Sequence, residues 1–226
     1  MESLLAAVPE LPWLRLMYTF PGHITPRLIS VLASSPQVCP YIDIPLQHAH
    51  PATLKRMGRP ADVEATRALL HRLRESIPEL VLRSTFIVGY PGETEEEFSA
   101  LRAFLQEEAL ERVGIFDYSF EEGTPSARLP EQVPEEVALA RRDELMALQQ
   151  EISQAWGRRQ VGRTVDVLVE GVGEEEIIAG RTRWDAPEVD GLVLAQGTAQ
   201  IGDIVPVRIT AASAYDLWGE KVEMRG

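Results

Sequence analysis

Short apolar runs alternate with amphipathic segments through roughly the first half of this chain of 226 residues. The apolar runs have the length of strands, and they are typical of strands buried on both faces of a parallel sheet. The segments between them repeat apolar residues at helical spacing. Four strands are predicted in this way, at residues 14–20, 41–46, 80–88 and 112–120. Strands that alternate with helices indicate an α/β fold with a parallel sheet.

Local signals mark where the intervening helices begin. Pro26 is suited to the first position of a helix. Asp62 can cap a second helix, and Thr94 with Glu97 forms a capping box that opens a third. A longer helix is predicted over residues 134–155, because apolar residues recur there near the helical period.

The pattern changes after this long helix. Short strands separated by glycine turns are predicted at residues 164–169, 191–194 and 203–210. Such strands are typical of small all-β barrels, and the segment suits a five-stranded, closed or partly open barrel of about 60 residues. The sequence therefore predicts two domains, an α/β part at residues 1–155 and an all-β part at residues 160–226.

Composition narrows the class of protein. The formal net charge is −13, and nucleic-acid backbones are bound mainly by Lys and Arg, so we expect no strong nucleic-acid binding and a better fit to a basic partner. No apolar run approaches the roughly 18 residues of a membrane span, and the start of the chain lacks the basic residues of a signal peptide. The single cysteine, Cys39, excludes a disulfide framework and favours a cytoplasmic location.

The all-β part is itself acidic, with 12 acidic and six basic residues. Two acidic clusters are expected on turns of this part, one at residues 174–176 and one made of Asp185, Glu188 and Asp190. Such clusters are commonly solvated loops, and the alternative is a docking site for a basic protein.

Polar residues follow the strands, where chemistry is expected in a parallel α/β barrel. Gln47 directly follows the strand at residues 41–46, and its amide can donate and accept hydrogen bonds to a ligand. Arg59 lies twelve residues later and offers a guanidinium group that suits a carboxylate. Each also has an ordinary interpretation, as a polar residue at a strand end and as a solvated arginine after a helix.

The next two strands carry further candidates. Thr85 lies four residues before Gly89, whose missing side chain lets the backbone approach a flat ligand closely. Glu93 follows in the same loop, where a carboxylate can also simply stabilise the N-terminus of the next helix. Ser119 leaves the fourth strand, and its residue type alone says little.

His48 and His50 have the spacing of a metal-binding pair on a strand. The sequence near them offers no third ligand of the usual kinds, and His50 with Pro51 is typical of a helix entry, so no metal site is predicted. Two roles remain open for His48, a hydrogen-bond donor toward a substrate or a structural group. Cys39 has no cysteine partner in the chain and is interpreted as a packing residue or an incidental thiol.

Three motifs together resemble those of a known family: YIDIPLQH at residues 41–48, LKRMGR at 54–59 and STFIVGYPGE at 84–93. They resemble the radical S-adenosylmethionine methylthiotransferases, and the Leu-Gln-His run is similar to the branch that modifies an aspartate of a small-subunit ribosomal protein. The all-β part resembles the TRAM domain that follows the barrel in that family. The resemblance covers essentially the whole chain.

The resemblance implies a fold, cofactors and site residues. The fold would be a partial radical S-adenosylmethionine barrel of four strand–helix units, where the family has six, followed by a small TRAM barrel. The cofactors would be S-adenosylmethionine and 4Fe-4S clusters. The residues implied for binding S-adenosylmethionine are Gln47, Arg59, Thr85, Gly89 and Ser119, with the first two at its methionine and ribose parts. His48 would face the substrate, and no catalytic residue is implied.

The cysteines that this chemistry requires are missing from the sequence. The family binds one 4Fe-4S cluster through three cysteines in a C-x-x-x-C-x-x-C loop and a second through three cysteines of an N-terminal domain. Because only Cys39 is present, we expect a C-terminal fragment of a methylthiotransferase, inactive alone. The full-length enzyme would add a methylthio group to the β-carbon of the aspartate.

Two alternatives remain open from the sequence. One is a transfer-RNA methylthiotransferase, which the Leu-Gln-His run and the acidic all-β part disfavour. The other is a non-enzymatic binding module that kept this fold after losing the cluster.

Overall fold

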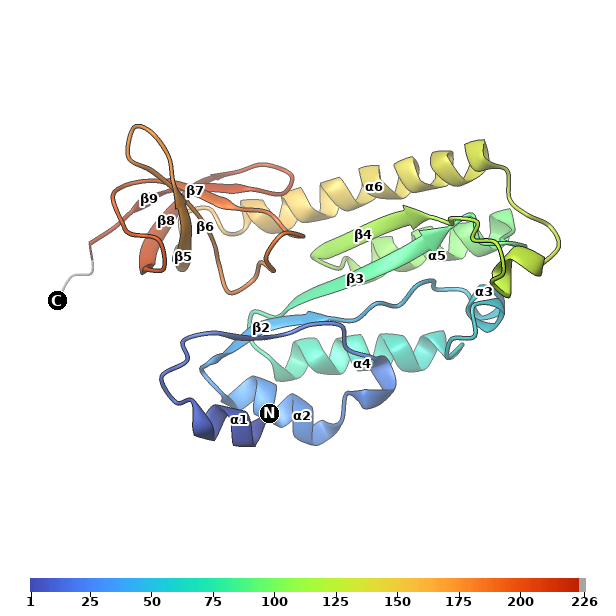
Figure 1. Ribbon diagram of the computed structural model, residues 1–226, viewed down its shortest axis with the longest axis horizontal. Helices are drawn as coiled ribbons and strands as arrows, with labels where there is room; N and C mark the ends of the chain where they lie inside the picture. The colour runs from blue at the N-terminus through green and yellow to red at the C-terminus, as the bar shows by residue number, and fades with distance from the viewer. Residues whose placement is uncertain (224–226) are drawn as a thin grey trace. The chain divides into compact units, whose positions relative to one another are not determined.

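The computed structural model describes residues 1–223, which fall into two compact units (Figure 1). The α/β unit comprises Leu16–Ser34 and Ile42–Gln149. The β-barrel unit comprises Met1–Arg15, Ser35–Tyr41 and the chain from Gln150 onward. The domain ranges expected from the sequence, 1–155 and 160–226, stay a prediction.

A four-stranded sheet with the order β1-β2-β3-β4 forms the first half of the fold. Its strands are β1 (Leu14–Leu16), β2 (Val38–Asp43), β3 (Val81–Val88) and β4 (Arg112–Asp117). β3 and β4 pair in parallel, as predicted. The predicted bounds were wrong for β2, which ends at Asp43, because Ile44 and Leu46 are apolar as buried core residues and not as members of the strand. β1 and β4 are also shorter than predicted.

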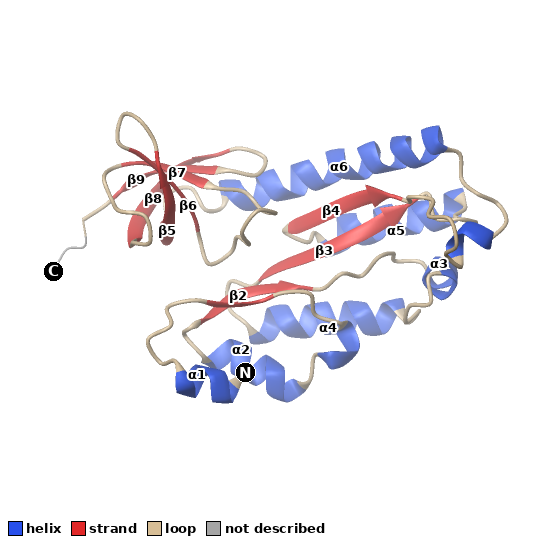
Figure 2. Ribbon diagram, in the orientation of Figure 1, coloured by secondary structure: helices blue, strands red, loops and turns tan. Residues whose placement is uncertain are grey.

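Figure 2 shows the helices in blue, and α2, α4 and α5 begin where their local signals predict. The helices are α1 (Glu2–Ala7), α2 (Pro26–Ser34), α3 (Pro51–Arg56), α4 (Val63–Ser76), α5 (Glu95–Glu108) and α6 (Glu135–Arg158). The Asp62 carboxylate accepts from the Ala65 amide, and Thr94 with Glu97 forms the capping box. Among the described residues, no helix is long and apolar enough to cross a membrane.

β3 has one buried face and one half-open face. Phe86 is fully buried, and its ring packs edge-on against Phe104 of α5 with 6.2 Å between ring centroids. Arg83, Thr85 and Ile87 alternate with the buried positions and are only half-buried. We expected this strand to be buried on both faces. The difference arises because α5 covers the Phe86 face, and side chains alternate between the two faces of a strand.

The second half of the fold contains a closed five-stranded barrel of order β5-β6-β7-β9-β8, which confirms the predicted all-β part. Its strands are β5 (Thr164–Val172), β6 (Ile177–Arg181), β7 (Val193–Gln196), β8 (Ile204–Ala212) and β9 (Leu217–Lys221). The sequence pattern did not locate β6 and β9. Each contains a glycine, and a Cβ at Gly180 would lie 2.2 Å from the Leu168 carbonyl oxygen, so the neighbouring backbone excludes a side chain there.

Two acidic residues in the connection between β6 and β7 accept hydrogen bonds from neighbouring groups. Asp185 is buried, and its carboxylate accepts hydrogen bonds from the amide and the hydroxyl of Thr182. The Asp190 carboxylate accepts from the Tyr41 hydroxyl at 2.6 Å and from the Ala186 amide at 2.8 Å. The expected exposed cluster of Asp185, Asp190 and Glu188 is therefore wrong for Asp185, because its carboxylate satisfies donors within the loop.

Candidate functional site

The predicted site residues lie on the segments that leave the sheet. The Gln47 amide donates to the Thr85 carbonyl at 2.9 Å, and the Ile87 amide donates to the Gln47 carbonyl at 2.9 Å. Gln47 and Thr85 therefore lie on adjacent segments. Gly89 directly follows β3, and Ser119 is exposed two residues after β4. The structure brings these four residues to neighbouring segments, and their shared contact with one ligand stays a prediction.

A glycine shapes the open face of β3 and β4. Gly114 lies opposite Thr85 in the parallel register. A Cβ at Gly114 would lie 3.2 Å from the ring of Phe116 and 3.7 Å from Cγ2 of Thr85. Phe116 is 56% exposed. The open face thus offers an exposed aromatic ring beside a position without a side chain, an arrangement that fits a flat, partly apolar ligand.

A buried carboxylate holds an arginine of β3. Asp43 is fully buried, and its carboxylate accepts from Nη1 of Arg83 at 3.0 Å and from the Tyr18 amide at 3.0 Å. Burying a carboxylate is costly unless it is paired and hydrogen-bonded, which both contacts achieve. Sequence reasoning missed this pair. The available signal was a charged residue inside each of two otherwise apolar strands.

His48 is buried, and both of its ring nitrogens have hydrogen-bond partners. Nδ1 accepts from the His50 amide at 3.0 Å, and Nε2 lies 3.0 Å from a carboxylate oxygen of Glu93. Because Nδ1 accepts, we assign the ring hydrogen to Nε2, which donates to Glu93. The role of His48 toward the substrate stays a prediction.

Glu93 joins three segments of the α/β unit. Its side chain is fully buried, and besides His48 it accepts from the Gly89 amide and from Nη1 of Arg141, the latter at 2.9 Å. The main contacts of the Glu93 carboxylate are thus with these three groups and not with the N-terminus of α5. Sequence reasoning missed Arg141 of α6. The signal was a charged residue on the apolar stripe that the buried Ala138 and Leu145 mark.

Glu97 ties α3 to α5. The guanidinium of Arg56 contacts both oxygens of its carboxylate, and the Thr53 hydroxyl donates to it at 3.1 Å. Burial alone would raise the pKa of Glu97. The hydrogen bonds from Arg56, from the Thr94 amide and from Thr53 outweigh burial, so the pKa lies below its ordinary value.

The lowered pKa of Glu97 predicts a loss of stability in acid. A carboxyl group whose pKa is lower in the folded state stabilises that state above the unfolded pKa of about 4.3, and the stabilisation is lost as the pH falls through the folded pKa. We expect the free energy of unfolding, measured with urea, to fall less between pH 7 and pH 3 in Glu97→Gln than in the wild type. The exposed neighbour Glu96, changed to glutamine, serves as the control. Equal losses in wild type and Glu97→Gln would contradict the expectation.

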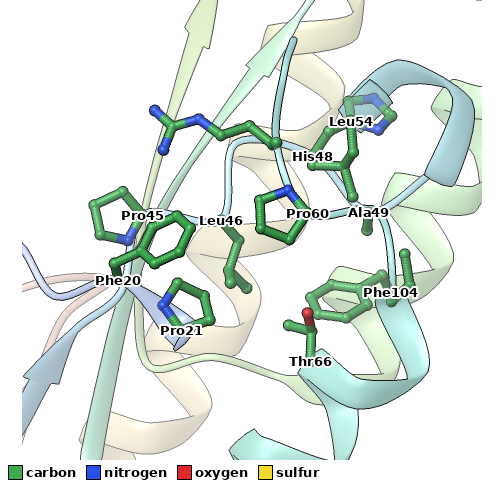
Figure 3. Close-up of a pocket in the computed structure, with 12 residues that line it drawn as sticks. Phe20, Pro21, Pro45, Leu46, His48, Ala49, Leu54, Pro60, Thr66 and Phe104 are labelled. Atoms are coloured by element: carbon green, nitrogen blue, oxygen red, sulfur yellow. The ribbon is translucent and has the colours of Figure 1, made fainter. Parts of the chain in front are cut away.

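Arg59 lines an apolar pocket between the segment after β2 and the helices α3 to α5. Figure 3 shows its mostly hydrocarbon walls, and labelled lining residues include Phe20, Pro21, Pro45, Leu46, Pro60 and Phe104. His48 lines the same pocket. Arg59 is exposed, and its amide donates to the Leu54 carbonyl at 2.8 Å. The structure thus brings Arg59 and His48 to one pocket, and a ligand shared by Arg59 and Gln47 stays a prediction.

The described residues do not fit an iron–sulfur cluster. Within residues 1–223 no group of three or more His, Cys, Asp or Glu residues could hold a metal ion. Cys39, the single cysteine of the sequence, is buried and free, as expected for a packing residue. A 4Fe-4S cluster of this type takes three cysteine thiolates. The open face formed by Thr85, Gly114 and Phe116, in contrast, offers an exposed aromatic ring beside a position without a side chain.

Comparison with known proteins confirms the predicted fold class. Residues 2–105 match the model of the radical SAM superfamily, and residues 161–222 match the model of the TRAM domain. The solved structure of coproporphyrinogen III oxidase from Escherichia coli superposes with a TM-score of 0.55, over 67% of this chain and 36% of that chain. The two are only 18% identical, so this likeness supports the fold alone.

Curated relatives match nearly the whole chain. It is 53% identical to a protein named ribosomal protein uS12 methylthiotransferase RimO from Roseiflexus sp., over 99% of this chain and 48% of that protein. The protein of the same name from Herpetosiphon aurantiacus is 51% identical, over 98% and 48%. The chain thus spans about half the length of the curated relatives it matches. These matches do not favour the transfer-RNA enzyme or the non-enzymatic module. They confirm the predicted resemblance: the chain is similar to radical S-adenosylmethionine methylthiotransferases that are named for ribosomal protein uS12.

Proposed function

We propose that this chain forms the cofactor-binding side of a methylthiotransferase that modifies an aspartate of ribosomal protein uS12. The observation that carries the proposal is the open face of β3 and β4, where Gly114 leaves space beside Thr85 and the exposed ring of Phe116. S-adenosylmethionine, when bound with the clusters of the family, supplies the radical and methyl chemistry. Because the described residues offer no cluster ligands, we expect no activity from this chain alone.

The predicted polar residues would bind and orient the cofactor. In the proposal, Gln47 and Arg59 bind its methionine and ribose parts, and the Thr85 hydroxyl binds the ribose. Gly89 lets the backbone approach the ligand, and Ser119 lies toward the adenine. Phe116 would cover an apolar face of the nucleoside and exclude water from it.

Two substitutions test this assignment. We expect Gln47→Ala and Arg59→Ala each to weaken S-adenosylmethionine binding by about 1–3 kcal/mol, because each removes a hydrogen bond to a polar or charged group. The measurement is the dissociation constant in the protein expressed from its complete reading frame, with iron content determined in parallel. Arg72→Ala and Gln106→Ala, which change exposed residues of α4 and α5, are the matched controls. Unchanged affinity in both test variants would reject the assignment.

The acidic β-barrel unit supports a basic protein as the partner, rather than RNA. Glu174, Glu175 and Glu176 are exposed on the turn between β5 and β6. Exposed charges of this kind chiefly raise the rate of encounter, and salt screens them beyond roughly 8–10 Å. A cytoplasmic location is part of the same proposal, since the substrate is a ribosomal protein.

The partner proposal predicts a salt-dependent complex. We expect the complete protein to bind purified uS12 more weakly as salt rises, and a triple Gln variant at residues 174–176 to lose most of that salt dependence. Titrations with uS12 and with transfer RNA at two salt concentrations provide the measurement. Tighter binding to the transfer RNA at both concentrations would overturn the choice of partner.

A further inference from the structure

We propose that His48 is a positioning residue that fixes the backbone of Gln47 and thereby aims the Gln47 amide at the cofactor. The inference rests on the proposed function for the role of Gln47. It does not require His48 to touch cofactor or substrate, and it explains why a buried histidine directly follows a candidate binding residue.

Gln47 has a backbone conformation that its side chain disfavours. Its φ is +72°, in the left-handed region that residues other than glycine rarely adopt. Such a conformation persists only where the surrounding structure holds it. Two backbone hydrogen bonds, to Thr85 and from Ile87, hold one side of Gln47 against β3. Within residues 1–223 the Gln47 side-chain amide makes no hydrogen bond, so this conformation presents a polar group with free hydrogen-bonding capacity.

The ring of His48 restrains the other side of Gln47. Its Nδ1 accepts from the His50 amide, which fixes the ring against the backbone that follows. Its Nε2 donates to Glu93, and the side chain is fully buried. Because the ring is held at both nitrogens, the Cα–Cβ bond of His48 is fixed in direction, and this restrains the backbone on that side of Gln47.

Glu93 is itself held rigidly enough to serve as the anchor. Its carboxylate also accepts from the Gly89 amide and from Arg141, and Nη1 of Arg141 donates to the Glu93 carbonyl at 3.1 Å as well. A continuous set of hydrogen bonds thus runs from α6 and the turn after β3 to His48. Gln47 is positioned by this set from one side and by β3 from the other.

Two conservative substitutions separate the hydrogen bonds of His48. Glutamine places an N–H donor near the position of Nε2 and retains the bond to Glu93. Asparagine is shorter, so its amide oxygen can replace Nδ1 as acceptor for the His50 amide but no donor reaches Glu93. In the complete protein, we expect His48→Asn to weaken S-adenosylmethionine binding by on the order of tenfold and His48→Gln by less than about threefold. In the Gln47→Ala background, His48→Asn should have no further effect, because the residue acts through Gln47.

Amide hydrogen exchange tests the same inference without the cofactor. We expect faster exchange in His48→Asn at the amides of Gln47 and Ile87, and wild-type rates in His48→Gln. An equal loss of affinity from His48→Asn with and without Gln47 would overturn the inference, as would unchanged exchange at both amides. If the wild-type protein does not bind S-adenosylmethionine, the proposed function fails. Exchange then still decides whether His48 fixes the Gln47 backbone.

Discussion

Replacing Glu93 by alanine is expected to lower the free energy of unfolding by about 3–5 kcal/mol. The substitution removes a fully buried carboxylate and leaves the guanidinium of Arg141, which is 9% exposed, without its main counter-charge. It also leaves Nε2 of His48 and the Gly89 amide without their acceptor. A buried charge that loses its partner costs far more than the pair itself contributes. Urea unfolding followed by circular dichroism measures the loss.

Glu95 provides a matched control for Glu93. Its carboxylate binds Nη2 of the same Arg141 at 3.2 Å, but its side chain is 77% exposed. Ion pairs in contact with water contribute about 0–1 kcal/mol, so Glu95→Ala should cost no more than that. Equal losses from Glu93→Ala and Glu95→Ala would show that burial does not decide the strength of these contacts. Removing Arg141 together with Glu93 should recover part of the loss, because no guanidinium is then left buried and unpaired.

Local sequence signals predicted the elements of the fold better than their ends. The helix caps at Asp62 and Thr94 depend on residues within one turn, and both occur where expected. The apolar pattern placed β2 wrongly at both ends, since Ile44 and Leu46 are buried beyond its end and the strand begins three residues earlier than the pattern indicated. Gly180 and Gly219 interrupt the apolar pattern of β6 and β9. Both are required by the close approach of neighbouring strands in the closed barrel, which the pattern of a single strand does not reveal.

The sequence predicted only those site residues that can be identified from a single strand and the loop after it. A polar residue after a strand, such as Gln47, can be identified from its own segment. Its left-handed φ cannot, and neither can the hydrogen bond of His48 to Glu93, which is 45 residues further along the chain. Arg141 lies 48 residues beyond Glu93. Such pairs are visible in the sequence only as charges at positions where the pattern demands an apolar residue.

Gly89→Ala is expected to cost about 2–5 kcal/mol, through two separate effects. The φ of Gly89 is +71°, and a side chain in the left-handed region costs about 1–2 kcal/mol. A Cβ there would also lie 2.4 Å from Cβ of Ala138 on α6, so the turn or the helix must move, at a cost of about 1–3 kcal/mol. Such a movement would also disturb the hydrogen bond from the Gly89 amide to Glu93.

Gly58 separates the two effects of a substitution at Gly89. Its φ is +67°, nearly that of Gly89, but a Cβ there would meet no atom within 4 Å. Gly58→Ala should therefore show the conformational cost alone, and the excess loss in Gly89→Ala measures the overlap with Ala138. The double variant Gly89→Ala with Ala138→Gly should recover most of that excess, less about 1 kcal/mol for a glycine within a helix. If Gly58→Ala and Gly89→Ala lose equal stability in urea unfolding, the overlap of a side chain at Gly89 with Ala138 adds nothing to the conformational cost, and the turn after β3 does not pack closely against α6.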